Sequence, residues 1–487
     1  MFHQKLWGEI NLPAKKELKM IIIGNPIQFL GGGPRRTYEV LKHYSELGVE
    51  TTLYIPLSQV VITLALQRFF HISEKNLYKD LEDLEKHGVY IPEAVLAYLE
   101  KMDKRVVKYL DTLKKRGVIW ILNHFKKLIS LSDKEVIVSV KNFLESENVY
   151  GNHVKTHAVY VMDNPLDMVQ AGQFISQSIK VPLFILLQFI PVSSLKSLVK
   201  NEWAYNVSLG GELSLKTLFR IIIQTLEQSC LKYKTLFTYN NASKTLTALF
   251  SVSEAPLRLS KLDTWAFDRG IPTKVLVPGN AVSQEIEKYY REREKILRAK
   301  DDCAVFYARL GASKGILEVP YIAKELEKAG HKLILIGNFD SINTKTRFER
   351  ICEKLSVKNI EYMGYLPPDK DLWEIVAKSK VLIYPSHYDS FSLAVLESLF
   401  LGTAVVAYNI HAITSIYKNL PTVEIVDEYD YKSMARKAIK ILKMDLNEFY
   451  MKNMDRNLLD FLELHHSWKN VAKEEKNTIQ EFVSLNC

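Results

Sequence analysis

The chain has 487 residues, of which 47% are hydrophobic and 25% are charged, so we expect a globular protein of two domains rather than one core or a disordered chain. The net charge of +9, from 65 basic and 56 acidic residues, is mild for this length. With no RNA-module signature and no basic run interleaved with aromatic residues, we expect no nucleic-acid partner. The longest apolar runs hold 12 residues, as in 181–192, short of the roughly 20 that a bilayer span needs.

The amino terminus and the cysteines both favour a cytoplasmic location. Residues 1–20 contain no apolar run of the signal-peptide type. The four cysteines lie far apart, without the spacing of a metal site, as in a protein whose thiols stay reduced. We therefore expect a cytoplasmic protein without a metal cluster.

The first half of the chain shows an α/β pattern. Short runs rich in aliphatic, β-branched and aromatic residues predict strands, and helical stretches separate them. The strands are expected at 18–24, 49–56, 135–140, 157–163, 182–188 and 235–239. This pattern predicts a parallel sheet that helices cover on both faces.

A glycine-rich loop follows the first of these strands. Gly31, Gly32 and Gly33 precede a helical stretch, and residues without a Cβ allow a ligand to approach the backbone closely. Arg35 and Arg36 follow in the first helical turn. The dinucleotide fingerprint G-x-G-x-x-G is absent, which disfavours a nicotinamide-dependent dehydrogenase.

A charged helical stretch, residues 57–131, indicates an insertion into the first α/β domain. It carries apolar residues at three- and four-residue spacing, as on one face of a helix: Leu77, Leu81 and Leu84. Near its end Trp120 and Phe125 lie among lysines. This end either lies in a membrane interface, beside a lipid-linked acceptor, or is an apolar helix packed on the first domain.

A turn at 274–282 and the charged helix after it indicate a domain boundary. We expect a first domain at 1–282, a second at 283–455 and a last helix at 456–487. The second domain alternates strands and helices regularly, with strands at 303–308, 332–337, 359–364, 380–386, 403–408 and 422–426. Two such sheets facing each other leave a cleft lined by the loops at the carboxyl ends of the strands, and this arrangement suits a two-substrate enzyme.

Two basic residues occur in YARLGASKG, residues 307–315, after the first strand of the second domain. Arg309 and Lys314 would stand in a loop beside a helix amino terminus. Two fixed cations there can hold a diphosphate and stabilise the charge of a leaving nucleotide. The alternative is an exposed loop with two surface cations.

Two carboxylates occur in HYDSFSLAVLES, residues 387–398. Asp389 precedes a helix that is expected to begin near Ser390, and Glu397 lies eight residues after Asp389. Carboxylates accept hydrogen bonds from vicinal sugar hydroxyls, and free N–H groups of a first helical turn hold phosphate or sugar oxygens. That turn comprises Ser390, Phe391, Ser392 and Leu393. Alternatively, Asp389 is only a helix cap and Glu397 a half-exposed helix residue.

In this order, the segments resemble the retaining glycosyltransferases of family 4 (glycosyl transferases group 1), which have the GT-B fold. The resemblance rests on GGGPRR (31–36), ARLGASKG (308–315), DSFSLAVLE (389–397) and ESLFLGTAVVAY (397–408). VPGNAV (277–282) is similar to the family's interdomain turn, and SWKNVAKE (467–474) to its last helix, which crosses back to the first domain. The resemblance is good from about residue 274 onward and patchy before it.

The resemblance implies a role for each segment. Arg309 and Lys314 would bind the donor diphosphate, together with the amino-terminal turn 390–393. Glu397 would bind the ribose hydroxyls, and Asp389 the donor sugar. The loop with Gly32 and Gly33 would approach the diphosphate from the facing domain and help to place the acceptor. The family uses no bound metal and no cofactor besides its nucleotide-sugar co-substrate, and retention would follow from a front-side transfer.

Two residues depart from the family pattern. Asp389 replaces the usual glutamate and is one methylene shorter, which bears on donor choice. Gln188 stands where the family often has a histidine that lines the sugar site, and an amide carries no proton.

We therefore expect two facing Rossmann-like domains and the transfer of a hexose from a nucleotide-diphosphate sugar. The acceptor would be a saccharide or a lipid-linked saccharide, the latter with peripheral membrane contact. Two alternatives stay open: a transferase acting on a soluble sugar or glucan, and an inactive nucleotide-sugar-binding subunit that scaffolds an active partner. Gln188 favours the inactive subunit, whereas the retained Arg309 and Glu397 oppose it.

Overall fold

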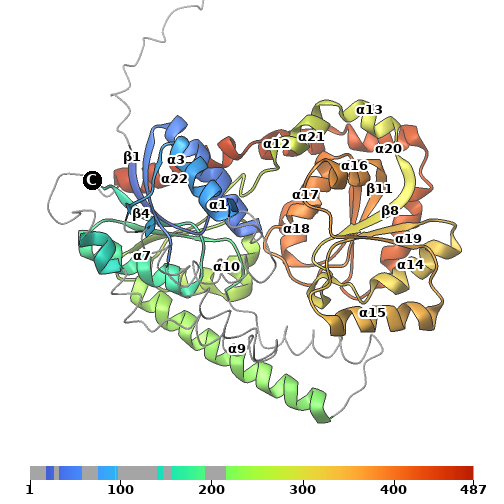
Figure 1. Ribbon diagram of the computed structural model, residues 1–487, viewed down its shortest axis with the longest axis horizontal. Helices are drawn as coiled ribbons and strands as arrows, with labels where there is room; N and C mark the ends of the chain where they lie inside the picture. The colour runs from blue at the N-terminus through green and yellow to red at the C-terminus, as the bar shows by residue number, and fades with distance from the viewer. Residues whose placement is uncertain are drawn as a thin grey trace, which may run out of the picture.

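A computed structural model describes residues 18–26, 32–56, 75–93, 95–96, 140–145, 156–191 and 215–485 of the chain. Its described part forms two α/β lobes that lie side by side (Figure 1). Among the described helices, none combines the length and the apolar character that a bilayer crossing requires.

The first lobe is built on a seven-stranded parallel sheet in the order β3-β2-β1-β4-β5-β6-β7. Its strands are β1 (Leu18–Ile23), β2 (Val49–Tyr54), β3 (Val89–Tyr90), β4 (Ala158–Val161), β5 (Leu183–Leu187), β6 (Leu246–Ser251) and β7 (Thr273–Val275). Its described helical elements are α1 (Gly32–Tyr44), η2 (Ser45–Leu47), α3 (Lys75–Lys86), α7 (Leu166–Ile179), α9 (Leu215–Ala242), α10 (Glu254–Ser260) and α11 (Leu262–Phe267).

The second lobe is built on a six-stranded parallel sheet in the order β10-β9-β8-β11-β12-β13. Its strands are β8 (Asp301–Tyr307), β9 (Leu333–Ile336), β10 (Ile360–Gly364), β11 (Ser379–Tyr384), β12 (Ala404–Tyr408) and β13 (Val423–Val426). The helical elements from here to the end of the chain are α12 (Gln284–Arg291), α13 (Arg293–Arg298), η4 (Ala312–Lys314), α14 (Val319–Lys328), α15 (Ile342–Leu355), α16 (Lys370–Lys378), α17 (Leu393–Phe400), α18 (His411–Tyr417), α19 (Tyr431–Leu442), α20 (Leu446–Asn453), α21 (Arg456–His465) and α22 (Trp468–Leu485).

The central strands of the second lobe are apolar without alternation because helices cover both faces of the sheet. Successive residues of β11 pack into different cores: Val381 lies in one buried cluster and Leu382 in the other. In β12, Val405 packs into the cluster of Leu382, and Val406 packs into the cluster of Val381. The strands predicted for this lobe are confirmed within about two residues at each end.

One strand predicted for the first lobe, at 235–239, is wrong. Residues 235–239 belong to α9, where Thr235, Thr238 and Tyr239 are buried at three- and four-residue spacing. The packing of this helical face overrides the β-propensity of the threonines and aromatic residues, and the strand of this region is β6. Val140, the end of the strand predicted at 135–140, is helical, and 135–139 lie outside the described residues.

The predicted insertion, residues 57–131, is described only in part. Within it α3 is a helix as expected, and Leu81 and Leu84 of its stripe are buried in the core of the first lobe. The side chain of Leu77, and all of Trp120 and Phe125, lie outside the described residues. The membrane-interface hypothesis for this segment stays a prediction.

The chain crosses between the lobes twice, from β7 to α12 and from α21 to α22, and α22 packs against α1 (Figure 1). The two crossings touch each other, because His465 Nδ1 donates to the carbonyl oxygen of Asn280 at 2.7 Å. Arg36 Nε donates to the carbonyl oxygen of Gly279 at 2.8 Å. A Cβ at Gly279 would lie 2.2 Å from the carbonyl oxygen of Val252, so the first crossing must be glycine at this point.

Candidate active site

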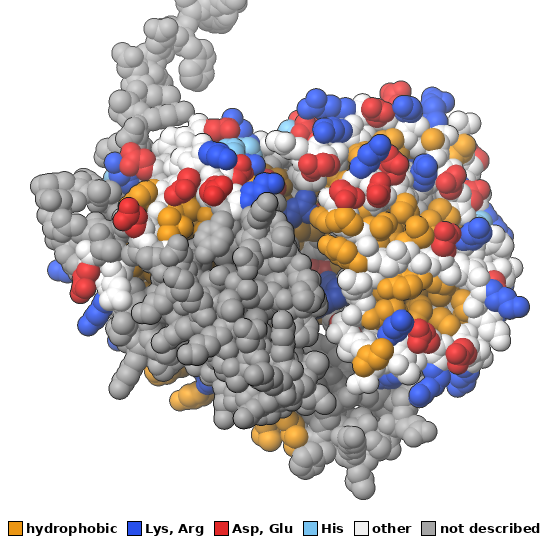
Figure 2. All heavy atoms as spheres, viewed as in Figure 1, with side chains coloured by type: hydrophobic (Ala, Val, Ile, Leu, Met, Phe, Trp, Pro, Cys, Tyr) orange, Lys and Arg blue, Asp and Glu red, His pale blue; other side chains and the backbone are white. Residues whose placement is uncertain are grey.

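A cleft of about 1410 Å³ separates the carboxyl ends of the two sheets and is lined from both lobes. Figure 2 shows Lys and Arg side chains where the two lobes meet. Every site residue predicted from the sequence lines this cleft: Gly32, Gly33, Arg309, Lys314, Asp389, Ser390, Phe391, Ser392, Leu393 and Glu397. Their placement together follows from the parallel topology, which brings βα loops to one edge of each sheet.

The loop after β8 ends in η4, whose last residue is Lys314. Gly315 follows with φ of 75°, and a Cβ there would lie 2.0 Å from the carbonyl oxygen of Pro385. Only glycine fits this backbone conformation and this contact. Gly315 therefore allows the loop of Lys314 to lie directly against the loop that follows β11.

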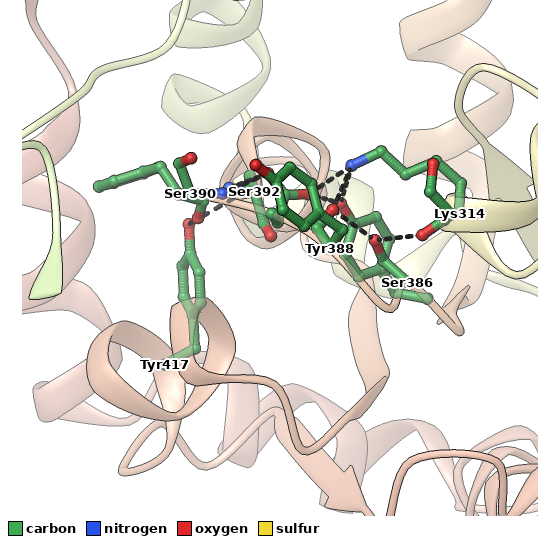
Figure 3. A network of polar contacts seen from close by, with 10 residues as sticks. Lys314, Ser386, Tyr388, Ser390, Ser392 and Tyr417 are labelled. Atoms are coloured by element: carbon green, nitrogen blue, oxygen red, sulfur yellow. Dashed lines mark hydrogen bonds and ion pairs between the residues drawn. The ribbon is translucent and has the colours of Figure 1, made fainter. Parts of the chain in front are cut away.

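Lys314 is held by the loop after β11 (Figure 3). Its Nζ donates to Asp389 Oδ2 at 2.6 Å and to the carbonyl oxygen of Tyr388 at 3.2 Å. The hydroxyl of Tyr384 donates to the same Asp389 oxygen. Burial alone would lower the pKa of Lys314, but Asp389 and Tyr384 outweigh burial and raise it. The ammonium group therefore keeps its charge in a largely buried position.

Asp389 also fixes the backbone that follows it. Its Oδ1 accepts from the N–H groups of Ser390 at 3.0 Å and Ser392 at 3.3 Å. Burial would raise the pKa of Asp389, but Lys314, Tyr384 and these N–H groups together lower it. Asp389 thus has the capping role that the sequence offers as one alternative, and the same carboxylate also contacts a cation.

The helix expected near Ser390 begins instead at Leu393. Ser392 has a left-handed backbone with φ of 69°, and Tyr417 donates to the carbonyl oxygens of Phe391 at 3.0 Å and Ser392 at 3.2 Å (Figure 3). Residues 390–392 therefore form a tight loop because Asp389 and Tyr417 satisfy its backbone. Of the predicted amides, Ser392 N is already engaged, while those of Phe391 and Leu393 have no hydrogen bond with the described residues.

Glu397 lies one helical turn into α17 and is 7% exposed. Its Oε1 is 3.5 Å from Arg35 Nη1, which comes from the first turn of α1 in the other lobe. Burial raises the pKa of Glu397 to about 7, although Arg35 opposes this shift. The expectation of a half-exposed helix residue is wrong, because α17 packs this face inward.

Arg309 is exposed at the rim of the cleft. Its guanidinium makes no ion pair or hydrogen bond with the described part of the chain. Such a cation is available to a ligand, whereas Lys314 already pairs with Asp389.

The glycine loop reaches the facing lobe. A Cβ on Gly32 would lie 3.1 Å from Leu393 Cδ1. A Cβ on Gly33 would lie 3.4 Å from Gln188 Oε1 and 3.5 Å from Asp163 Oδ2. Gly31 lies outside the described residues.

Gln188 stands at the carboxyl end of β5, and its amide orientation follows from its partners. Nε2 donates to the carbonyl oxygen of Met162 and to Thr37 Oγ1, the latter at 3.2 Å. Its oxygen therefore faces Gly33 and the cleft, so that Gln188 offers a ligand an acceptor and not a donor.

Two titratable groups were missed from the sequence. Asp163, after β4, is 7% exposed, and burial raises its pKa to about 7. His387 lies between Glu318 Oε1 at 2.5 Å and Glu428 Oε1 at 2.9 Å, and its backbone N–H donates to Ser313 O at 2.9 Å. Asp163 is the last residue of the strand predicted at 157–163, a position from which it could have been chosen, whereas the partners of His387 are remote in sequence.

Residues 290–458 match the family model described as glycosyl transferases group 1. An uncharacterized glycosyltransferase of Methanocaldococcus jannaschii is 26% identical over 176 residues, which are 36% of this chain and 43% of that relative. The chain thus spans less than half the length of this curated relative. The resemblance predicted from the sequence is confirmed for the second lobe.

Solved structures match nearly the whole chain. HepE of Anabaena, in complex with UDP and glucose, has a TM-score of 0.56 at 12% identity and covers 95% of this chain and 99% of its own. Sucrose-phosphate synthase from Thermosynechococcus elongatus has a TM-score of 0.57 at 12% identity and covers 96% and 100%. These likenesses confirm the GT-B fold, with two facing Rossmann-like lobes.

Proposed function

We propose that this chain is a retaining glycosyltransferase that moves a hexose from a nucleotide-diphosphate sugar to a hydroxyl of a saccharide or lipid-linked saccharide, without a bound metal. One observation carries the proposal. Lys314 from one segment, and Asp389 and Glu397 from another, line one interdomain cleft with their charged groups held in place. Hydrolysis of the donor in the absence of an acceptor is the reaction that tests it.

The diphosphate would lie between Lys314 and Arg309. Lys314 is oriented by Asp389, and Arg309 has no partner within the described residues. The N–H groups of Phe391 and Leu393 at the start of α17 would add hydrogen bonds to the same anion. These groups are in place before the reaction, so they stabilise the negative charge that develops as the nucleotide leaves.

The nucleoside would lie beside Glu397, whose carboxylate accepts hydrogen bonds from the two ribose hydroxyls. Aromatic and apolar residues after β10 line the cleft and would enclose the base: Tyr365, Leu366, Pro368, Leu372 and Trp373. Asp389 would contact the donor sugar on the side away from the nucleoside.

The acceptor would enter from the first lobe, where Gln188, Phe189 and Gly33 line the cleft. Its hydroxyl oxygen attacks the anomeric carbon from the face that the diphosphate leaves. The bond from this carbon to the phosphate oxygen breaks, and that oxygen takes the proton of the acceptor hydroxyl. The new glycosidic bond therefore keeps the anomeric configuration, and the leaving phosphate supplies the base that Gln188 does not.

A second candidate is an inactive subunit that binds nucleotide sugars. The hydrogen bonds of Gln188 favour it, because neither amide proton is left for a sugar. The geometry proposed to bind the donor fits both functions. Measuring turnover distinguishes them.

The test is slow donor hydrolysis across UDP-, GDP- and ADP-hexoses, with Lys314→Met and Glu397→Ala beside the wild type. Lys328→Met is the matched control, since Lys328 is exposed on α14 and pairs only with Glu325, its neighbour on that helix. Turnover of one donor by the wild type and the control, lost in both site variants, supports the transferase. Tight nucleotide binding without hydrolysis, and without transfer to any acceptor of a saccharide panel, would establish the inactive subunit. Failure to bind any nucleotide would refute both functions.

A further inference from the structure

Arg35 and Glu397 face each other across the cleft from different lobes. Arg35 lies in the first turn of α1, and Glu397 in α17. Their side chains are 18% and 9% exposed, and a single contact of 3.5 Å joins Nη1 to Oε1. The pair is therefore largely shielded from water, but its one long contact leaves much of the hydrogen-bonding capacity of both groups unused.

The contact with Arg35 offsets only part of the free-energy cost of burying the Glu397 carboxylate. Despite the guanidinium, burial raises the pKa of Glu397 to about 7. A buried carboxylate in this condition gains from any further donor. In the proposed function, the ribose hydroxyls supply two such donors at the same oxygens.

A bound diphosphate would offer Arg35 a second partner, its phosphate oxygens, within the same cleft. Arg35 lines the cleft together with Arg309 and Lys314, the two residues proposed to hold the diphosphate. A guanidinium binds phosphate oxygens through two parallel N–H groups, a stronger interaction than the single 3.5 Å contact with Glu397. A nucleoside diphosphate could therefore bind Glu397 through its ribose and Arg35 through its phosphates at the same time. The contact between Arg35 and Glu397 would compete with both of these interactions.

We propose that Arg35 is a phosphate-binding residue that pairs with Glu397 across the empty cleft and moves to the phosphates when a nucleoside diphosphate binds, leaving Glu397 to the ribose. This inference rests on the proposed function, because it assumes a nucleotide in the cleft. Because Arg35 exchanges Glu397 for phosphate, a diphosphate frees Glu397 from Arg35, whereas a nucleoside without phosphates does not.

Other contacts keep the lobes together when the pair separates. Tyr388 donates its hydroxyl proton to the carbonyl oxygen of Ile190 at 2.8 Å, from one lobe to the other. Ser253, at the start of α10, donates likewise to the carbonyl oxygen of Ser390. Removing Arg35 therefore changes the charge in the cleft without removing the contacts that hold the lobes against each other.

The experiment measures the affinity of the full chain for UDP, GDP and ADP, and then for the nucleoside of the best ligand, by calorimetry. Arg35→Met keeps the length of the side chain and removes its charge. Lys328→Met, on α14 and outside the cleft lining, controls for the loss of one positive charge; Lys328 is exposed and pairs with Glu325 at 2.6 Å. We expect Arg35→Met to weaken the diphosphate about tenfold or more and to weaken the nucleoside less, because the nucleoside senses the loss of Arg35 only through the pKa of Glu397.

The same substitution in a Glu397→Gln background separates this role from an effect exerted through Glu397. If Arg35 contacts phosphate, Arg35→Met still weakens the diphosphate about tenfold there. If Arg35 only orients Glu397, the second substitution has no further effect, and this result would overturn the inference. Equal weakening of nucleoside and diphosphate would overturn it as well. A wild type that binds none of the three diphosphates would refute the proposed function, and the inference with it.

Discussion

Arg36 and Glu475 form a buried ion pair with 2.5 Å between Nη2 and Oε1, although 439 positions separate them in the chain. Tyr44 donates to the other carboxylate oxygen at 2.5 Å. Burial would lower the pKa of Arg36, but Glu475 raises it above its ordinary value. The pair joins α22 to α1, directly after the glycine loop of the cleft.

Replacing one member of this pair should destabilise the protein strongly. Glu475→Gln leaves a guanidinium buried without its counter-ion, which costs about 3–5 kcal/mol of the free energy of unfolding. The neighbouring Glu474→Gln removes only a partly exposed contact with Lys274 and should cost no more than about 1 kcal/mol. Urea unfolding of both variants measures the difference, and equal losses would contradict the prediction.

Nucleoside binding should strengthen as the pH rises through about 7. The folded-state pKa of Glu397 is raised to about 7, so the carboxylate that accepts ribose hydroxyls forms only above that pH. Calorimetric titration from pH 5.5 to 8.5 should show this dependence in the wild type and a flat profile in Glu397→Gln. Asp163 also has a pKa of about 7, so Asp163→Asn is the control. If the pH dependence disappears in Asp163→Asn, it arises from Asp163 and not from Glu397, and the prediction is wrong.

His387 should stabilise the protein in acid more than in alkali. Burial would lower its pKa, but Glu318 and Glu428 raise it to about 9, above the ordinary 6.5. The stabilisation from the imidazolium is therefore complete below about pH 6.5 and is lost as the pH rises through about 9. The Tm difference between wild type and His387→Gln should be larger at pH 6 than at pH 10. Equal Tm differences at the two pH values would contradict this prediction.

Asp389→Asn should lower donor turnover more than donor affinity. The amide keeps an oxygen for the N–H groups of Ser390 and Ser392 but loses the negative charge that orients Lys314. A misplaced cation at the leaving diphosphate costs about 10²–10³ in kcat, as for other preorganised charges. Asp389→Glu, the usual family residue, should keep the larger part of the activity. A loss confined to KM would argue against a role in the reaction itself.

Donor hydrolysis should be insensitive to chelators. In the proposed function, Lys314 and Arg309 would provide the positive charge that other transferases take from a divalent ion, so EDTA should leave kcat within about twofold. Loss of activity in EDTA, restored by Mg²⁺ or Mn²⁺, would refute metal independence. A dialysed sample without chelator is the control for inactivation during handling.

The residues proposed to bind the donor could largely be predicted, because they lie in a few short segments of the sequence. The segments of Lys314, Asp389 and Glu397 each follow a strand, and parallel sheets bring such loops together. The start of α17 was misplaced because the left-handed turn at Ser392 depends on the hydroxyl of Tyr417, 25 residues later. The strand expected at 235–239 failed for a related reason, since tertiary packing decides whether β-prone residues form a strand.

Contacts between the lobes could not be predicted. Arg35 and Glu397 are 362 positions apart, and Arg36 and Glu475 are farther still. Two consecutive arginines look equivalent in the sequence, yet the first faces the cleft and the second is buried against the last helix. Helical geometry turns successive side chains about 100° apart, and only the fold determines what each direction meets.

The two crossings between the lobes also define a pivot. Arg36 is bonded to the first crossing at Gly279 and, through Glu475, to the helix that follows the second, while His465 and Asn280 join the crossings to each other. Two chain segments fixed side by side resist translation but permit rotation about the line between them. Movement of one lobe against the other is then lever-like, small at Gly279 and largest at the far rim of the cleft.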